Sequence, residues 1–473
     1  MELSKEQNDV FNKYIQGENV FITGPGGTGK SVIIKEIYKH AKEKENKIEE
    51  DNINIKSKKN KKIQVCALTG CAAVLLQCNA KTIHSWSCIG QGNGSIESIV
   101  KKVTDSYHRR KNWINTDILV IDEVSMMSLK LFELLDEIGR KIRKKTAHLP
   151  FGGIQLIFSG DFYQLPPVGN IDEPETSQFC FESNLWNQVF KKENQIPLVQ
   201  IFRQSDSVYA NILNQIREGK LKRSSYEILL KRVGKKYSIN DNNNDNNNNN
   251  NNNNKNIQPT KLFPKRNQVE QINQMEMNKL CSEEKIYKMK RMYDTGNISR
   301  NNNNNNKFTT KEEKEYEFSY LEKSIPSELE VRLKVGAQVM CIVNMETSYG
   351  SHKLCNGSQG IIVRFNDFGL PIVKFHGINE EITMEYHIWA SENISSIGLA
   401  QIPLILAWAL TIHKSQGTTL DLAEIDVGNN VFECGQTYVA LSRVKSLEGL
   451  YLSSFNYTKI LTNKKVKAYY SSF

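Results

Sequence analysis

A glycine-rich loop near the N-terminus constrains this chain more than any other stretch of its sequence. Residues 21–31 read FITGPGGTGKS, which fits the phosphate-loop pattern G-x-x-x-x-G-K-[ST]. An apolar strand at 20–22 leads into the loop, and the residues from Val32 to Tyr38 have the apolar spacing of a helix. Glycines let consecutive backbone N–H groups surround a polyphosphate, and the positive end of the helix faces the anion. The sequence therefore predicts that this chain binds a nucleoside triphosphate.

The residue types in this loop have expected roles. Lys30 can reach the β- and γ-phosphates, and the Ser31 hydroxyl can ligate Mg²⁺. Upstream of the loop, Gln7 has two open interpretations. It closes a helix capping box with Ser4, or its amide pairs with the edge of adenine. The predicted nucleotide-binding residues are Gln7, Gly24, Pro25, Gly26, Gly27, Thr28, Gly29, Lys30 and Ser31.

Two carboxylates follow a second buried strand, which reads DILVIDE over residues 117–123. In a parallel sheet they arrive at the edge where the phosphate loop also opens, so Asp122 is expected to hold Mg²⁺. Glu123 is then placed to take the proton from an attacking water. After the next strand, at 153–161, Gln164 is placed to touch the γ-phosphate or that water.

Length and charge limit the class of protein. A chain of 473 residues predicts two to four domains, and a net charge of +10 with a pI of about 8.9 suits a polyanionic partner. The nine cysteines show no C-x-x-C pair, which predicts a reducing, intracellular compartment. No apolar run approaches the ~20 residues of a membrane span, so no membrane partner is expected.

The order of patterns predicts the domain organisation. Strand, loop and helix alternate through residues 20–200, and a second block of this kind starts near residue 198. Asparagine-rich runs at 246–254 and 301–306 are expected to be disordered insertions. Short β runs broken by turns over 326–398 predict a small antiparallel barrel inserted in the second block. The predicted domains are therefore 1–196, 197–325, 326–398 and 399–473, with the second and fourth forming one domain.

Two further stretches keep alternative interpretations. The basic run at 56–62 is either a solvated loop or a nuclear targeting signal. Thr82, His84 and Trp86 follow a strand at 63–68 and the helix after it. They either grip a sugar-phosphate backbone and stack a base, or Trp86 is buried beside a hydrogen-bonded His84.

Taken in order, these stretches resemble the motifs of superfamily-one helicases, and most closely the Pif-one type 5′-to-3′ DNA helicases, with RecD-like enzymes next. The resemblance is carried by residues 24–31, 122–123, 160–167, 413–417 and 440–443. Residues 131–156 and 354–360 point to the Pif-one branch. The resemblance covers nearly the whole chain except 41–62 and about 220–325. It implies an α/β fold of two RecA-like parallel-sheet P-loop domains with a small inserted SH3-like β-barrel.

The resemblance also implies roles for single residues. Arg203 and Arg443 would approach the γ-phosphate from the second α/β domain, Gln7 would contact adenine, and Gln164 would sense the γ-phosphate. The residues implied to line a single-strand channel are Thr82, His84, Thr411, His413 and Lys414. The wedge that parts the duplex in this family does not map onto a motif here. Because the chain starts close to Gln7, the extra N-terminal domains of many relatives are expected to be missing.

The implied function is an ATP-dependent DNA helicase that moves 5′-to-3′ on single-stranded DNA, with ATP and Mg²⁺ as cofactors. Its expected substrates are duplex or G-quadruplex junctions in DNA replication, repair, recombination or telomere maintenance. A monomer in the nucleus, or alternatively the mitochondrion, is expected. The alternatives are an ATPase that displaces proteins without unwinding, and a helicase for RNA or RNA–DNA hybrids. A small-molecule kinase would not need Arg203 and Arg443, and a non-catalytic binding protein would not need Glu123.

Overall fold

The computed structural model describes residues 3–50, 61–237, 258–293 and 311–473, apart from 77, 91, 93, 171, 205, 326, 347–352, 355, 377, 379, 392–393 and 395. The chain forms two compact units. The first contains residues 1–222, 432–442 and 460–473, and the second contains 223–431 and 443–459. The predicted insertions at 246–254 and 301–306, and most of the basic run at 56–62, lie outside the described residues.

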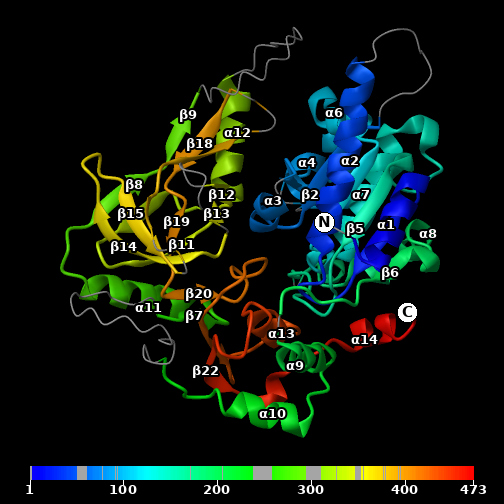
Figure 1. Ribbon diagram of the computed structural model, residues 1–473. Helices are drawn as coiled ribbons and strands as arrows, with labels where there is room; N and C mark the ends of the chain where they lie inside the picture. The colour runs from blue at the N-terminus through cyan, green and yellow to red at the C-terminus, as the bar shows by residue number, and fades with distance from the viewer. Residues whose placement is uncertain are drawn as a thin grey trace. The chain divides into compact units, whose positions relative to one another are not determined.

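A six-stranded sheet organises the first unit, with the strand order β3-β2-β4-β5-β1-β6. Figure 1 labels its strands β2, β5 and β6. All of its pairings are parallel, and Phe21 lies opposite Phe158 on one side and Gln195 on the other. The strands are β1 (Val20–Thr23), β2 (Ile63–Ala67), β3 (Lys81–Thr82), β4 (Ile118–Asp122), β5 (Gln155–Ser159) and β6 (Gln195–Pro197). The predicted parallel α/β fold of the first half is confirmed.

Helices cover both faces of this sheet, because successive strand residues point to opposite faces and both sets are apolar. Val20 and Ile22 belong to one core cluster and Phe21 to the other. The first cluster packs under α1 (Lys5–Gln16), α2 (Lys30–Glu50) and α3 (Gly70–Leu76). The second packs under α4 (Ile83–Ser87), α5 (Ile96–Thr104), α6 (Tyr107–Asn115), α7 (Leu129–Ile142) and α8 (Trp186–Val189). Short 3₁₀ turns connect these elements at 124–126, 144–146, 150–153, 174–176, 180–182 and 192–194.

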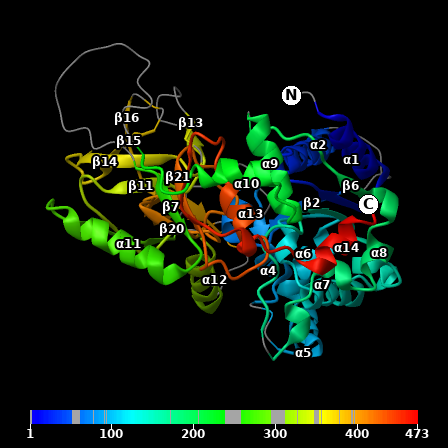
Figure 2. The ribbon, with the colours of Figure 1, turned by 90° about the horizontal axis from the view of Figure 1, so that it is seen from below.

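Three helices from distant parts of the sequence complete the first unit. They are α9 (Ser207–Glu218), α13 (Gln436–Leu441) and α14 (Lys464–Tyr470). Val466 of α14 is part of the second core cluster, and the hydroxyl of Tyr469 accepts a hydrogen bond of 3.2 Å from the Trp186 indole of α8. Figure 2 shows α14 beside α8. This division of the chain differs from the predicted boundary at 196, because residues 197–222 and the C-terminal helix belong to the first unit.

A smaller parallel sheet, with the order β20-β7-β21-β22, lies in the second unit. Its strands are β7 (Thr260–Phe263), β20 (Ala409–Thr411), β21 (Ala423–Val427) and β22 (Leu450–Phe455). Helix α10 (Arg223–Leu230) opens this unit, and α11 (Arg266–Lys279) follows β7. The Asn273 side chain of α11 makes hydrogen bonds with both the N–H and the carbonyl of Ala409. These bonds hold the helix on the edge strand of the sheet.

The rest of the second unit is antiparallel. Its main sheet has the order β16-β15-β14-β11-β19, and smaller sheets pair β10 with β8, β12 with β13, and β17 with β18 and β9. The strands are β8 (Lys285–Lys288), β9 (Lys290–Met292), β10 (Glu330–Leu333), β11 (Gln338–Cys341), β12 (Met345–Glu346), β13 (Lys353–Leu354), β14 (Gln359–Phe365), β15 (Pro371–Phe375), β16 (Glu381–Thr383), β17 (His387–Ala390), β18 (Gly398–Gln401) and β19 (Leu404–Leu406). Helix α12 (Lys311–Ser324) packs Phe318 and Leu321 against β18, and a 3₁₀ turn at 457–459 follows β22.

The antiparallel character predicted for 326–398 is confirmed, although β8, β9 and β19 lie outside those bounds. Closure of these strands into an SH3-like barrel stays a prediction. The Gln359 amide donates to the Thr260 hydroxyl and to the Leu422 carbonyl, which ties the antiparallel strands to the parallel sheet. Of the helices in the described part of the chain, none combines the length and the apolar character needed to cross a bilayer.

Candidate nucleotide-binding site

The predicted phosphate loop lies between β1 and α2, at the carboxyl end of the first sheet. The Lys30 ammonium donates to the carbonyl oxygens of Gly24 at 2.7 Å and Pro25 at 2.9 Å, so its side chain curls back over the loop. Burial lowers the pKa of Lys30, whereas the nearby carboxylates of Asp161, Glu123 and Asp122 oppose that shift. The loop therefore holds a cation at the place where a phosphate is expected.

At two positions of the loop, neighbouring residues approach so closely that only glycine fits. Gly27 has φ +85°, and a Cβ atom there would lie 2.4 Å from the Cβ of Arg203. Gly29 has φ +82°, and a Cβ there would lie 2.5 Å from Nε2 of Gln7. Both positions combine left-handed backbone with close packing, a combination that only glycine tolerates.

Gln7 forms the predicted capping box and also contacts the phosphate loop. Its side-chain oxygen accepts from the Ser4 N–H at 2.9 Å, and the Ser4 hydroxyl accepts from the Gln7 N–H at 3.2 Å, so the capping box is confirmed. Its Nε2 donates to the Gly29 carbonyl at 3.3 Å, which places the buried amide against the phosphate loop. Contact with adenine stays a prediction.

The predicted acidic pair ends β4. Asp122 is buried and accepts a 2.9 Å hydrogen bond from the Glu123 N–H, and burial together with the charge of Glu123 raises its pKa to about 6. A nearby cation would lower this pKa and favour the charged form of the carboxylate. Ser31 at the start of α2 and Asp122 supply hydroxyl and carboxylate oxygens, the donor types that Mg²⁺ prefers, so these residues fit the ion.

Glu123 has left-handed backbone, with φ 58° and ψ 38°. This conformation is uncommon for a residue with a Cβ atom, and such conformations occur preferentially at functional sites. The role of Glu123 as the base stays a prediction.

The stretch after β5 contains an ion pair that sequence reasoning missed. Arg217 of α9 binds Asp161 in a bidentate manner, with both N···O distances at 2.9 Å, and Asp161 is fully buried. The guanidinium lies 4.5 Å from the centre of the Tyr163 ring, and that ring stacks on Tyr470 of α14. Burial lowers the pKa of Arg217, but Asp161 more than offsets this, so the net shift is upward.

This cluster is connected to the phosphate loop and to the predicted γ-phosphate sensor. The Tyr470 hydroxyl lies 2.6 Å from the Thr23 hydroxyl, one residue before the loop. The Asp161 carbonyl accepts from the N–H of Gln164 at 2.8 Å, and the Gln164 side chain is buried. Contact between Gln164 and a γ-phosphate stays a prediction. Arg217 and Tyr470 lie in none of the sequence motifs, so only the fold brings them to this site.

Arg203 lies against the phosphate loop within the first unit, whereas the sequence placed it on the second domain. Its Nη1 donates to the Ser442 carbonyl at 3.3 Å. Burial lowers its pKa, and Tyr438 and Glu123 oppose that shift. The hydroxyl of Tyr438 accepts from the N–H of Gly26 at 2.8 Å, a contact across 412 positions of sequence. The available signal for Tyr438 was its place two residues before the matched run 440–443, in which only Arg443 received a role.

The other predicted arginine and three predicted DNA contacts belong to the second unit. Arg443 is buried, and its Nη1 donates to the Thr418 carbonyl at 3.3 Å. Thr411 is buried at the end of β20, and its hydroxyl accepts from the N–H of Lys414, whose side chain is exposed. His413 between them is half-buried. The roles of Arg443, Thr411, His413 and Lys414 stay predictions.

Thr82 and His84 lie in the first unit, at the carboxyl end of its sheet. The Thr82 hydroxyl caps α4 by accepting from the Ser85 N–H at 3.3 Å. Trp86 is buried and packs against Trp113, with ring centres 4.6 Å apart, so the base-stacking interpretation of Trp86 is wrong. The large apolar ring gains more by joining the second core cluster than it would by remaining exposed.

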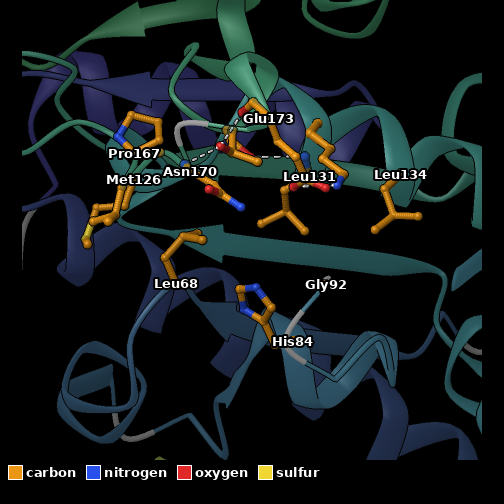
Figure 3. A pocket seen from close by; sticks show the side chains of 14 residues that line it. Leu68, His84, Gly92, Met126, Leu131, Leu134, Pro167, Asn170 and Glu173 are labelled. Atoms are coloured by element: carbon orange, nitrogen blue, oxygen red, sulfur yellow. Dashed lines mark hydrogen bonds and ion pairs between the residues drawn. The ribbon is translucent and has the colours of Figure 1, made fainter. Parts of the chain in front are cut away.

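His84 lines a pocket of about 330 Å³ in the first unit (Figure 3). The other lining side chains come from loops after β2, β4 and β5 and from α7, and many are apolar. They include Leu68, Met126, Leu131, Leu134, Pro167 and Val168. Burial lowers the pKa of His84, which favours the neutral ring.

Lys130 of α7 holds two loops at the edge of this pocket. Its ammonium forms a 2.8 Å ion pair with Glu173 and donates to the Gly94 carbonyl at 2.8 Å. The pocket lining thus combines the His84 ring and apolar side chains with the polar side chains of Ser128, Asn170 and Thr176 and with the Lys130–Glu173 pair. The ring and the apolar side chains suit stacking against a base.

The chain matches two sequence profiles of known proteins and several curated relatives. The profile described as PIF1-like helicase matches residues 2–227, and the profile described as DNA helicase Pif1, 2B domain, matches residues 319–365. The chain is 33% identical to the ATP-dependent DNA helicase PIF1 of Danio rerio, covering 99% of this chain and 63% of that protein. It is 30% identical to the ATP-dependent DNA helicase RRM3 of Saccharomyces cerevisiae, covering 99% and 67%. The chain spans 61–64% of the length of the first four curated relatives it matches.

Two solved structures show the same architecture. The crystal structure of Pif1 helicase from Candida albicans matches with a TM-score of 0.72 and 29% identity, covering 100% of this chain and 99% of that one. The Bacteroides Pif1 helicase in complex with ADP-AlF3 and ssDNA matches with a TM-score of 0.60 and 26% identity, covering 100% and 97%. These likenesses confirm the expected architecture of RecA-like P-loop domains.

Proposed function

Because the chain belongs to the PIF1-like helicase family, we propose that it is an ATP-dependent DNA helicase, which moves along single-stranded DNA and unwinds duplex. One observation carries this proposal. The first unit assembles a phosphate loop, an acidic pair and Arg203 around one point, although these groups are far apart in sequence. A phosphate loop alone would also suit a kinase, but the family likeness extends across both units.

In this proposal each side chain has a defined task. Lys30 and the N–H groups of the loop bind the β- and γ-phosphates. Ser31 and Asp122 hold Mg²⁺, which supplies charge neutralisation to the phosphates when bound. Glu123 accepts the proton of the attacking water, and Arg203 stabilises the charge that develops on the γ-phosphoryl group.

The second unit supplies most of the remaining roles in this proposal. Arg443 completes the γ-phosphate contacts, and Gln164 detects the γ-phosphate, so that hydrolysis changes how the two units engage the strand. Thr411, His413 and Lys414, with Thr82 and His84 of the first unit, contact single-stranded DNA. The net charge of +10 supports a nucleic-acid partner, as does the likeness to a Bacteroides Pif1 helicase that was solved in complex with ssDNA.

The finer parts of the proposal rest on family resemblance. They are the 5′-to-3′ direction, action as a monomer on duplex or G-quadruplex junctions, and a nuclear role in replication, repair, recombination or telomere maintenance. Mitochondrial action is the alternative location.

A strand-separation assay tests the proposal. Duplexes with a 5′ tail, a 3′ tail or blunt ends are incubated with the protein, with and without ATP and Mg²⁺. We expect separation of the 5′-tailed duplex only, and only with ATP. Separation without ATP, or ATP hydrolysis that single-stranded DNA stimulates without separation of any duplex, would contradict the helicase activity. The second result would favour a translocase that displaces proteins.

A further inference from the structure

Gln204 carries a buried amide with no hydrogen-bond partner in the described part of the chain. The residue is 8% exposed, and neither its Oε1 nor its Nε2 atom is hydrogen-bonded there. Buried polar groups are nearly always paired, because an unpaired one has lost its hydrogen bonds to water without replacement. Because both ends of the amide lack a partner, reversing it by 180° does not relieve this loss. The side chain therefore needs a partner that the described residues do not supply.

The position of this amide identifies the kind of partner. Gln204 directly follows Arg203, and its Oε1 lies 3.3 Å from the point where a Cβ of Gly27 would stand. The segment is fixed there, because the N–H of Phe202 donates to the Gly27 carbonyl at 2.8 Å and the Cβ of Arg203 approaches Gly27 closely. The unpaired amide thus lies beside the phosphate loop.

A second buried glutamine provides a comparison with Gln204. Gln155 also has an unpaired Oε1, but its Nε2 donates to the carbonyls of Tyr14 at 2.9 Å and Glu18 at 3.0 Å. Gln155 begins β5, whereas the phosphate loop follows the end of the parallel strand β1, so the two glutamines lie at opposite ends of the sheet. Gln155 therefore has a structural partner, and Gln204 has none in the described residues.

We propose that Gln204 is a nucleotide-contacting residue. With its amide reversed, so that Nε2 takes the place of Oε1 beside the loop, its side-chain N–H donates to a phosphate oxygen of bound nucleoside triphosphate. This inference rests on the proposed function, since it assigns one more contact to the same ATP site. A neutral, fixed donor beside Arg203 adds a hydrogen bond to a charged oxygen without adding a further positive charge next to the arginine. Sequence reasoning gave roles to Gln7, Gln164 and Arg203 but none to Gln204.

Replacement of Gln204 by methionine, a side chain of similar length and shape, tests the proposal. We expect the melting temperature of Gln204→Met without nucleotide to equal or exceed that of the wild type, because an unpaired polar group is removed. Affinity for the non-hydrolysable analogue AMPPNP with Mg²⁺, measured by calorimetry, should fall about 10- to 100-fold, since a hydrogen bond to a charged group is lost. Gln204→Asn should not restore the affinity, because its amide is one methylene too short.

Gln155→Met is the matched control. It breaks the hydrogen bonds to Tyr14 and Glu18, so we expect a lower melting temperature with unchanged AMPPNP affinity. Wild-type affinity in Gln204→Met would overturn the inference, as would a melting temperature lowered as much as in Gln155→Met. If the wild type itself failed to bind AMPPNP, the proposed function would fail, and with it the inference; the two failures are therefore distinguishable.

Discussion

Arg217→Met should destabilise the first unit strongly. The substitution leaves the Asp161 carboxylate, which is fully buried, without the guanidinium that binds both of its oxygens at 2.9 Å. Removing one partner of a buried ion pair typically costs about 3–5 kcal/mol, because an uncompensated charge remains. The lost contact with the Tyr163 ring, at 4.5 Å, adds about 0.5–2 kcal/mol.

The assay is thermal unfolding followed by circular dichroism or calorimetry. For a unit of this size, 1 kcal/mol corresponds to about 2–4 °C, so the combined loss of about 3.5–7 kcal/mol should lower the melting temperature of the first unit by roughly 7–28 °C. The double substitution Asp161→Asn with Arg217→Met should recover part of the loss, because the buried charge is gone. Lys141→Met is the control, since Lys141 pairs with Glu137 on the surface and should shift the melting temperature little.

Two outcomes would contradict this expectation. A shift as small as that of Lys141→Met would show that Asp161 finds another partner or becomes protonated at little cost. Additive losses in the double substitution would show that the two side chains stabilise the fold independently.

Three other substitutions test contacts and roles elsewhere in the chain. Trp86→Ala should lower stability by about 3–5 kcal/mol, because it empties a buried site beside Trp113; loss of DNA affinity with an unchanged melting temperature would contradict this. Lys130→Met should weaken single-stranded DNA binding while nucleotide affinity stays unchanged, because the loop that contains Glu173 loses its ion pair with Lys130. Equal DNA affinities of the variant and the wild type would show that DNA binding does not depend on this ion pair. Arg443→Ala should keep ATP affinity but lower DNA-stimulated turnover by ~10³–10⁵-fold, with poor rescue by lysine; intact turnover with lost DNA binding would move Arg443 to the DNA channel.

The first half of the fold was predictable because its signals are local. The phosphate loop, the apolar strands and the acidic pair each occupy a few consecutive residues, and alternating burial of Val20, Phe21 and Ile22 follows directly from an apolar strand covered on both faces. The capping box of Gln7 is local too, and it formed as expected. Local patterns also gave the antiparallel character of 326–398, but they did not determine how its strands associate.

The remaining site residues depend on contacts that no local pattern contains. Tyr438 reaches Gly26, and Tyr470 reaches Thr23, across more than 400 positions. Arg217 sits on an ordinary amphipathic helix, and only the packing of α9 brings it to Asp161. Trp86 was ambiguous because the same aromatic side chain suits either a core or a base, and the sequence alone could not show that Trp113 would pack against it.

Strand separation by Glu123→Gln tests whether ATP hydrolysis at the phosphate loop of the first unit drives unwinding, with Glu123 as the base. The variant should bind AMPPNP as tightly as the wild type, because Lys30 and the loop are unchanged, while ATP hydrolysis falls by ~10²–10⁴-fold. Separation of a 5′-tailed duplex should fall by the same factor. If Glu123→Gln unwound the duplex at the wild-type rate, then either Glu123 is not the base or ATP hydrolysis at this loop does not drive unwinding.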